Sequence, residues 1–168
     1  MPQFLSGHAT HPDPHMALAL AGAQIEAQRA QLSQRQWHPT LGWLYMTEAY
    51  AASAGSLLAE MQKRWPGVHW VGASGPGVCA ADVEYFDEPA LSLMLCDLAS
   101  EQFRLFSGRQ PLGQWPAELA LIHACPGNPD LPSLISELAG RLSGGYVLGG
   151  LADGQQTSLH IADGIWQG

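Results

Sequence analysis

The chain has 168 residues, of which only 13% are charged, and 15 acidic against 7 basic side chains give a net charge of −8. The Lys and Arg residues are scattered, which argues against binding to nucleic acid or to anionic membranes, and no apolar run reaches the roughly 18–20 residues of a transmembrane helix. Its three cysteines form no close pair, so we expect reduced thiols in a single cytoplasmic domain over residues 1–168.

The N-terminal segment GHATHPDPH is polar and rich in histidine. Imidazole is the commonest neutral metal ligand, but the histidine spacing matches no standard metal motif and two prolines restrict the backbone. The candidate metal ligands are His8, His11, His15 and Asp13. We therefore predict that this segment is an entry loop and not a metal site. Asp13 followed by proline is typical of a helix start, and the apolar positions that follow predict a helix from about Pro14 to Leu32.

Residues 41–74 predict a strand, a helix and a second strand. Leu41 to Met46 is short, apolar and aromatic, as in a buried strand. Thr47 is predicted to cap a helix that ends before Pro66-Gly67, and Val68 to Ser74 is predicted to be the next strand. The apolar stripe of the helix, at helical spacing, consists of Tyr50, Ala54, Leu57, Leu58, Met61 and Trp65.

A polar, partly extended stretch, AADVEYFDEP, follows a glycine turn and precedes a predicted strand from Ala90 to Leu98. Residues 99–116 are less regular, with a short helix expected around Glu101 to Phe106. The earlier order then returns with a strand from Leu119 to Cys125, a helix capped by Asp130 and a strand from Tyr146 to Leu151. Two extended pieces, Thr157 to Ile161 and one ending at Trp166, complete the chain.

This order of elements predicts an internal repeat. A strand–helix–strand–turn–strand unit occurs at about residues 41–98 and again at 119–166, with an offset of about 78 residues. Parallel strands joined by a helix need a crossover, and the faces of their sheet need cover. The predicted fold is an α/β layered sandwich built from two similar strand-helix-strand-strand units, with an extra N-terminal helix.

Two glycine turns are the predicted ligand site. VGASGPGV and YVLGGLAD each follow a helix and end a strand, where backbone N–H groups can face an anionic or zwitterionic ligand. The residues predicted to bind a ligand are Gly72, Ser74, Gly75, Gly77, Gly149, Gly150 and Asp153.

Three enzymatic interpretations of the sequence are weaker. The match to G-x-G-x-x-A at Gly75 to Ala80 lacks the helix that would hold a pyrophosphate. Ser74 lacks both the final glycine and the following helix of a nucleophile elbow. Cys125 has His123 two positions earlier on the same strand face, but a core cysteine is the simpler interpretation. We therefore expect no enzyme.

Several segments together resemble the N-terminal half of a FIST domain, a bacterial sensory module. They are SGHA before an alanine-rich helix, then VGASGPGV, ALSLMLCDL, YVLGGLADG and TSLHIADGIWQG, in this order. The resemblance covers nearly the whole chain, and it carries over the two glycine turns but no catalytic residue.

The resemblance implies a non-enzymatic sensory domain that binds a small ligand, such as an amino acid or a small carboxylate. Its implied partners are a C-terminal FIST half or a downstream signalling domain, and a homo-oligomer is a further option. Two alternatives stay open. One is a nitric-oxide sensor that holds haem through a histidine, and the other is an interaction module that packs on a missing C-terminal half. The low charged fraction fits an apolar face covered by such a half.

Overall fold

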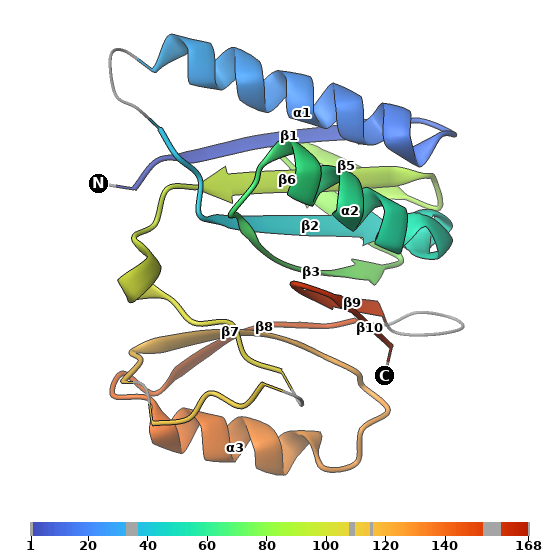
Figure 1. Ribbon diagram of the computed structural model, residues 1–168. Coiled ribbons are helices and arrows are strands. Elements are labelled where there is room, and N and C mark those ends of the chain that lie inside the picture. The colour runs from blue at the N-terminus through green and yellow to red at the C-terminus, as the bar shows by residue number, and fades with distance from the viewer. Residues whose placement is uncertain (1, 33–36, 108–109, 115, 153–158, 168) are drawn as a thin grey trace.

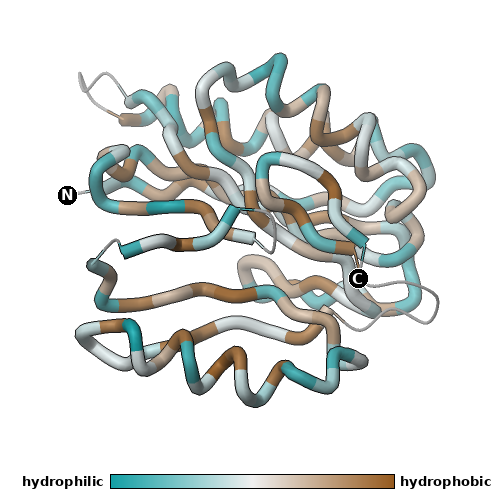
Figure 2. Tube along the Cα trace, turned by 60° about the horizontal axis from the view of Figure 1, so that its bottom comes forward, coloured by the Kyte–Doolittle hydropathy of each residue, from teal (hydrophilic) through white to brown (hydrophobic). Residues whose placement is uncertain are grey.

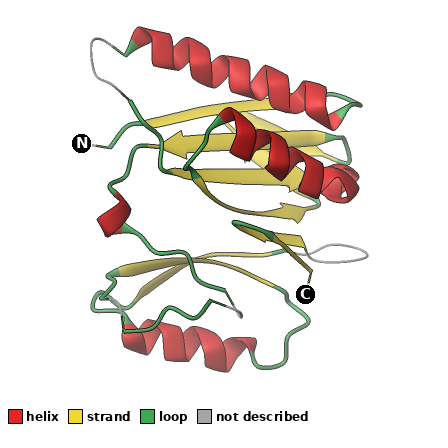
Figure 3. Cartoon of the chain, viewed as in Figure 1, coloured by secondary structure: helices red, strands yellow, loops and turns green. Residues whose placement is uncertain are grey.

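A six-stranded mixed sheet forms the centre of the protein in a computed structural model, which describes residues 2–32, 37–107, 110–114, 116–152 and 159–167 (Figures 1 and 3). The strand order is β1-β6-β2-β3-β9-β10; β2 and β3 are parallel, and every other neighbouring pair is antiparallel. The strands are β1 (Phe4–Thr10), β2 (Leu41–Thr47), β3 (His69–Gly75), β6 (Ala90–Cys96), β9 (Leu159–Ala162) and β10 (Ile165–Gln167).

Two helices, α1 (Pro14–Gln31) and α2 (Ala54–Arg64), cover one face of this sheet (Figure 1). The predicted start of α1 is confirmed, because the Asp13 carboxylate accepts hydrogen bonds from the backbone N–H groups of His15 and Met16. Thr47 occupies the N-cap position as predicted, but of a 3₁₀ helix, η1 (Glu48–Ser53), that precedes α2. Its hydroxyl accepts from the backbone N–H of Ala90 and makes no capping hydrogen bond.

The main core lies between these helices and the sheet. Strand alternation sends every second side chain toward the helices, and the predicted stripe of α2 meets them there. The largest fully buried side chains are Trp70, Tyr50, Leu18, Ile25, Leu44, Met46, Leu57, Met61, Leu91, Leu93, Leu95 and Ile161. The helix-free face of the sheet has a different composition, as described below.

Strand β1 replaces the predicted N-terminal entry loop. It pairs antiparallel with β6 along its whole length, from Phe4 opposite Cys96 to Thr10 opposite Ala90. Helix α1 packs so closely on it that a Cβ at Gly7 would lie 2.1 Å from the carbonyl oxygen of Ala21. The segment FLSGHAT has no strong β pattern of its own, so the pairing with β6 and the cover by α1 determine its conformation.

The polar stretch after the first glycine turn forms a hairpin of β4 (Gly77–Ala80) and β5 (Val83–Phe86). Ala81 and Asp82 at its tip both have positive φ, as a two-residue type I′ turn requires. The hairpin covers part of the helix-free face of the large sheet. Further along, the helix predicted at residues 101–106 is wrong, because only the 3₁₀ turn η2 (Ser100–Gln102) forms there.

A separate two-stranded parallel sheet contains β7 (Leu119–Ala124) and β8 (Tyr146–Leu151), joined by α3 (Leu131–Arg141). Asp130 precedes α3 as predicted, although its side chain makes no capping hydrogen bond. Helix α3 covers one face, over a small core of Ala117, Ala120, Ile122, Leu138, Leu142 and Val147. Figure 2 shows hydrophobic residues along both strands, and those on the opposite face are exposed.

The predicted repeat of two similar strand-helix-strand-strand units is not found. Both halves contain a strand–helix–strand segment with parallel strands, β2–α2–β3 and β7–α3–β8. In the described part of the chain, however, β7 and β8 pair only with each other, while β9 joins the large sheet beside β3. The fold is therefore mixed α/β, with a six-stranded sheet and two small sheets, and gives no evidence of a repeated unit over residues 41–98 and 119–166.

Candidate functional site

The predicted ligand residues Gly72 and Gly149 lie where two parallel strands approach each other. A Cβ on Gly72 would lie 1.8 Å from the carbonyl oxygen of Leu44, and one on Gly149 would lie 1.9 Å from that of Ile122. Both distances are far below van der Waals contact, so only glycine fits at either position. The backbone approach explains both glycines without a ligand.

The other predicted ligand residues are spread over two sheets. Ser74 is buried in β3, Gly75 ends that strand, and Gly77 begins β4. Gly150 is exposed in β8, and Asp153 lies outside the described residues. A cavity of about 190 Å³ lies at the carboxyl ends of β2 and β3, the place where open α/β sheets commonly bind ligands. Its lining is Thr47, Glu48, Ala49, Pro76, Asp87, Glu88 and Pro89.

Ser74 tests whether the first glycine turn needs its hydroxyl for folding. The side chain is 2% exposed, and its Oγ has no hydrogen-bond partner among the described residues. Because a buried hydroxyl without a partner opposes folding, Ser74→Ala is expected to leave the free energy of unfolding unchanged or to raise it by up to about 1 kcal/mol. Urea unfolding measures this. A loss of about 2 kcal/mol would instead show that the hydroxyl is bonded.

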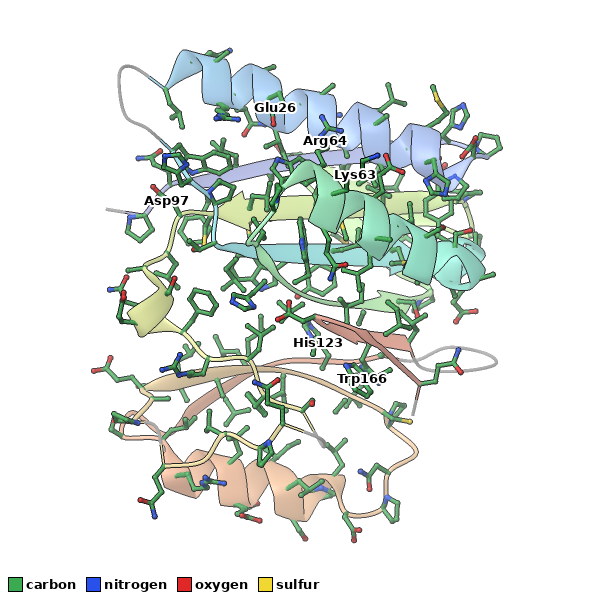
Figure 4. All side chains as sticks on the ribbon, in the orientation of Figure 1. Glu26, Lys63, Arg64, Asp97, His123 and Trp166 are labelled. Carbon is green, nitrogen blue, oxygen red and sulfur yellow. The ribbon has the colours of Figure 1, made fainter. Side chains whose placement is uncertain are left out.

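A polar cluster links the large sheet to the β7–β8 sheet. It lies on the faces of these two sheets that no helix covers, the helix-free faces. Tyr45 of β2, Ala73 of β3 and His160 of β9 lie opposite one another in register, so their side chains share the face away from α1 and α2. His123 of β7 meets this row, with its Nε2 2.9 Å from the Tyr45 hydroxyl and the two rings in T-shaped contact. Figure 4 places His123 at the boundary between the β7–β8 sheet and the large sheet.

All three members of the Tyr45–His123–His160 cluster are held neutral. Burial, together with the nearby His160, lowers the pKa of His123 from its usual 6.5 to about 4. Burial also lowers the pKa of His160 and raises that of the Tyr45 phenol. The Nδ1 of His160 is buried and has no hydrogen-bond partner among the described residues. The cluster thus contains a neutral imidazole with an unused polar atom.

The strands around this cluster contain no fixed charge. In β1, β2, β3 and β6 to β10 no residue is Asp, Glu, Lys or Arg. Any charge brought to the two helix-free faces must therefore be balanced by an imidazole or by a side chain from a loop. Such surroundings favour neutral groups in the cluster, as the pKa shifts indicate.

A comparison with protein-family models matches residues 40–167 to the FIST N domain. The chain belongs to the FIST N domain family. FIST N domains are signalling or sensory modules and are generally not catalytic. A comparison with curated proteins finds no match. None of the described helices is long and apolar enough to cross a membrane.

The match starts just before β2, so β1 and α1 precede the FIST N domain model. Both are nevertheless integral to the fold. Strand β1 extends the large sheet next to β6, and Ala17, Leu18, Ala21 and Ile25 of α1 are completely buried in the core. In this FIST N domain the residues before the matched range therefore complete one edge and one layer of the structure.

The N-terminal histidines of this FIST N domain have separate partners. His8 contacts the Tyr85 hydroxyl at 2.6 Å, and His11 accepts from the backbone N–H of Asp13. His15 Nδ1 lies 2.6 Å from Glu60, while its Nε2 lies 3.2 Å from the Ser56 hydroxyl. Within the described ranges no three His, Cys, Asp or Glu side chains are grouped so that they could hold a metal ion.

The Ser56–His15–Glu60 chain has the connectivity of a hydrolase triad, and sequence reasoning missed it. The side chains of His15 and Glu60 are 46% and 38% exposed, and the Ser56 hydroxyl also donates to the backbone of Ser53. Water around these groups screens the interactions that would activate a serine. The arrangement therefore carries no catalytic proposal.

Haem binding by this FIST N domain needs an accessible imidazole nitrogen beside a wide apolar slot. His123 has its Nε2 in contact with Tyr45, so this nitrogen is not free to bind a haem iron. His123 therefore does not fit that group.

Proposed function

We propose that this FIST N domain is a non-enzymatic sensory domain that binds a small ligand, an amino acid or a small carboxylate, at the Tyr45–His123–His160 cluster. The observation that carries the proposal is that the Nδ1 of His160 is buried without a hydrogen-bond partner among the described residues. A buried polar atom left unpaired costs about 1–3 kcal/mol, and a ligand that bonds it recovers part of this free energy. The domain therefore has a physical reason to bind a polar group at this point.

The chemistry of the cluster supports binding over catalysis. A general base works best when its pKa lies near the working pH, whereas the pKa of His123 is lowered to about 4 and that of Tyr45 is raised. Neither group exchanges a proton readily at neutral pH. Their fixed neutral forms instead offer directed hydrogen bonds, which suit recognition of a ligand.

A thermal-shift screen with amino acids and small carboxylates tests this function. A ligand at 100 times its Kd stabilises the fold by about 2.7 kcal/mol, which for a domain of this size raises Tm by several degrees. His160→Leu is expected to abolish the shift, and Ser74→Ala to preserve it. Loss of the thermal shift in Ser74→Ala alone would indicate that the ligand binds at the glycine turn instead. No shift with any compound would contradict the proposal.

A second role is favoured by the exposed apolar face of β7 and β8. Leu119, Leu121, Tyr146 and Leu148 lie on the face opposite α3 and are 53%, 39%, 68% and 54% exposed. Parallel strands are usually covered on both faces. We propose that the C-terminal FIST half implied by the resemblance packs on this face.

Co-purification with a C-terminal FIST half, supplied as a separate chain, tests the packing role. The wild-type domain is expected to retain the half, and the double variant Leu121→Glu/Leu148→Lys to lose it, because buried unpaired charges oppose association. Substitution of exposed Met16 on α1 by Lys is the matched control and is expected to retain it. Equal retention by the double variant would contradict this role.

A further inference from the structure

We propose that the ligand is a monocarboxylate that is taken up together with one proton, so that its carboxylate rests against the protonated ring of His160. This inference rests on the proposed function and adds to it the charge class of the ligand. Binding forms no covalent bond. One anion and one proton leave the solvent, and a carboxylate–imidazolium pair forms at the His160 Nδ1.

The geometry distinguishes His160 from His123 as the group that changes its charge. Tyr45 Oη lies at hydrogen-bond distance from the Nε2 of His123, so that ring already has a partner in its neutral form. The Nδ1 of His160 has none among the described residues. A proton on that nitrogen gives a donor for which the protein offers no acceptor, and a ligand oxygen supplies the acceptor.

The surroundings explain why the proton must come with the anion. The other titratable side chains on the strands of the two helix-free faces, or packed against them from β5, are His8, His69, Cys96, Tyr146 and Tyr85, and the Asp163 carboxylate of the β9–β10 turn contacts His69. His69 is already bonded to Asp163, and His8 to Tyr85. These strands place no Lys or Arg beside the cluster. An unpaired carboxylate there would lose its hydration without compensation, which costs several kcal/mol.

The same features disfavour other charge classes. A cationic amine would need a free carboxylate; the strands of both faces contain none, and Asp163 in the turn after β9 is already bonded to His69 and to the backbone N–H of Trp70. Burial lowers the pKa of His160 because its protonated form loses hydration there. A bound carboxylate balances the charge of that form and raises the pKa again, so ligand and proton favour each other's binding.

Calorimetry with three isosteric probes, propionate, propionamide and propylamine, tests the inference. Titrations at pH 7.5 in two buffers with different heats of ionisation measure the protons taken up. Propionate is expected to bind best and to take up close to one proton, and its affinity is expected to rise about tenfold for each pH unit between 8 and 7. His160→Gln is expected to abolish proton uptake, while His8→Gln, on the same sheet face, is expected to leave it unchanged.

The outcomes separate this inference from the proposed function. Tighter binding of propionamide or propylamine, or propionate binding without proton uptake, overturns the proton-coupled carboxylate and leaves ligand binding at the cluster intact. Proton uptake that persists in His160→Gln overturns the assignment to His160. If none of the probes binds and no amino acid or small carboxylate raises Tm in the thermal-shift screen, the proposed function fails together with the inference.

Discussion

Gly72→Ala is expected to lower the free energy of unfolding by about 3 kcal/mol or more, or to prevent folding. The added Cβ would lie 1.8 Å from the carbonyl oxygen of Leu44 and 2.7 Å from its carbonyl carbon. These are backbone atoms in the centre of the parallel pair β2–β3, so no side-chain rotation relieves the overlap. The strands must separate, which breaks ladder hydrogen bonds above the main core. Urea unfolding followed by circular dichroism measures the effect.

Gly75→Ala is the matched control in the same turn. The nearest atom to a Cβ there, other than its chain neighbours, is the carbonyl oxygen of Gly77 at 3.8 Å, an ordinary contact. Its expected cost is below about 1 kcal/mol. In the second glycine segment, Gly149→Ala and Gly150→Ala form an equivalent pair, since only Gly149 has a backbone atom in the way. Equal stability of Gly72→Ala and Gly75→Ala would contradict the close approach of β2 and β3.

These glycines show what the sequence could and could not reveal about the fold. Local patterns predict strands at residues 41–46 and 68–74, within one residue of β2 and β3, because apolar runs and glycine turns are visible in a few consecutive residues. The same patterns suggested glycines that bend the chain or hold a ligand. Their structural reason, a neighbouring carbonyl, depends on pairing with a strand about 28 residues earlier, as Gly72 does with Leu44. No local pattern contains that information.

Two other differences have the same origin. The segment GHATHPDPH, which includes the last four residues of β1, is expected to be a loop because it is polar and contains histidines and prolines. The pairing of β1 with β6 instead joins Phe4 to Cys96, about half of the chain away. The second strand–helix–strand segment resembles the first in sequence pattern. The sheet that its strands join is decided by packing, and β9, rather than β7 or β8, takes the place beside β3.

The candidate site was still harder to predict. From the sequence, Tyr45 is expected only as part of the buried aromatic strand Leu41 to Met46, His123 only as a neighbour of Cys125, and His160 as a lone histidine. Each lies in a correctly predicted strand, so alternation alone determines which face its side chain occupies. Only the register Tyr45–Ala73–His160 and the contact of β7 with β2 bring the three together. The available signal was the absence of charged residues from these strands, which makes any polar side chain on them notable.

His123 is expected to make the fold sensitive to mild acid. Its pKa of about 4 in the folded protein lies below the value of about 6.5 in the unfolded chain, so between these values the unfolded chain binds more protons. Stability therefore rises with pH and is lost as the pH falls from about 6.5 toward 4. Between pH 7 and pH 5 the expected loss from this residue is about 1–2 kcal/mol. Urea unfolding at a series of pH values measures it.

The variant His123→Gln isolates this contribution. Glutamine does not titrate and still offers an acceptor to the Tyr45 hydroxyl, so its free energy of unfolding is expected to fall less between pH 7 and pH 5 than that of the wild type. The difference should equal the 1–2 kcal/mol assigned to His123. His38→Gln, at an exposed position, is the control and is expected to retain the wild-type pH profile. Parallel profiles for wild type and His123→Gln would show that the His123 ring is hydrated, and that β7 does not pack on Tyr45 in solution.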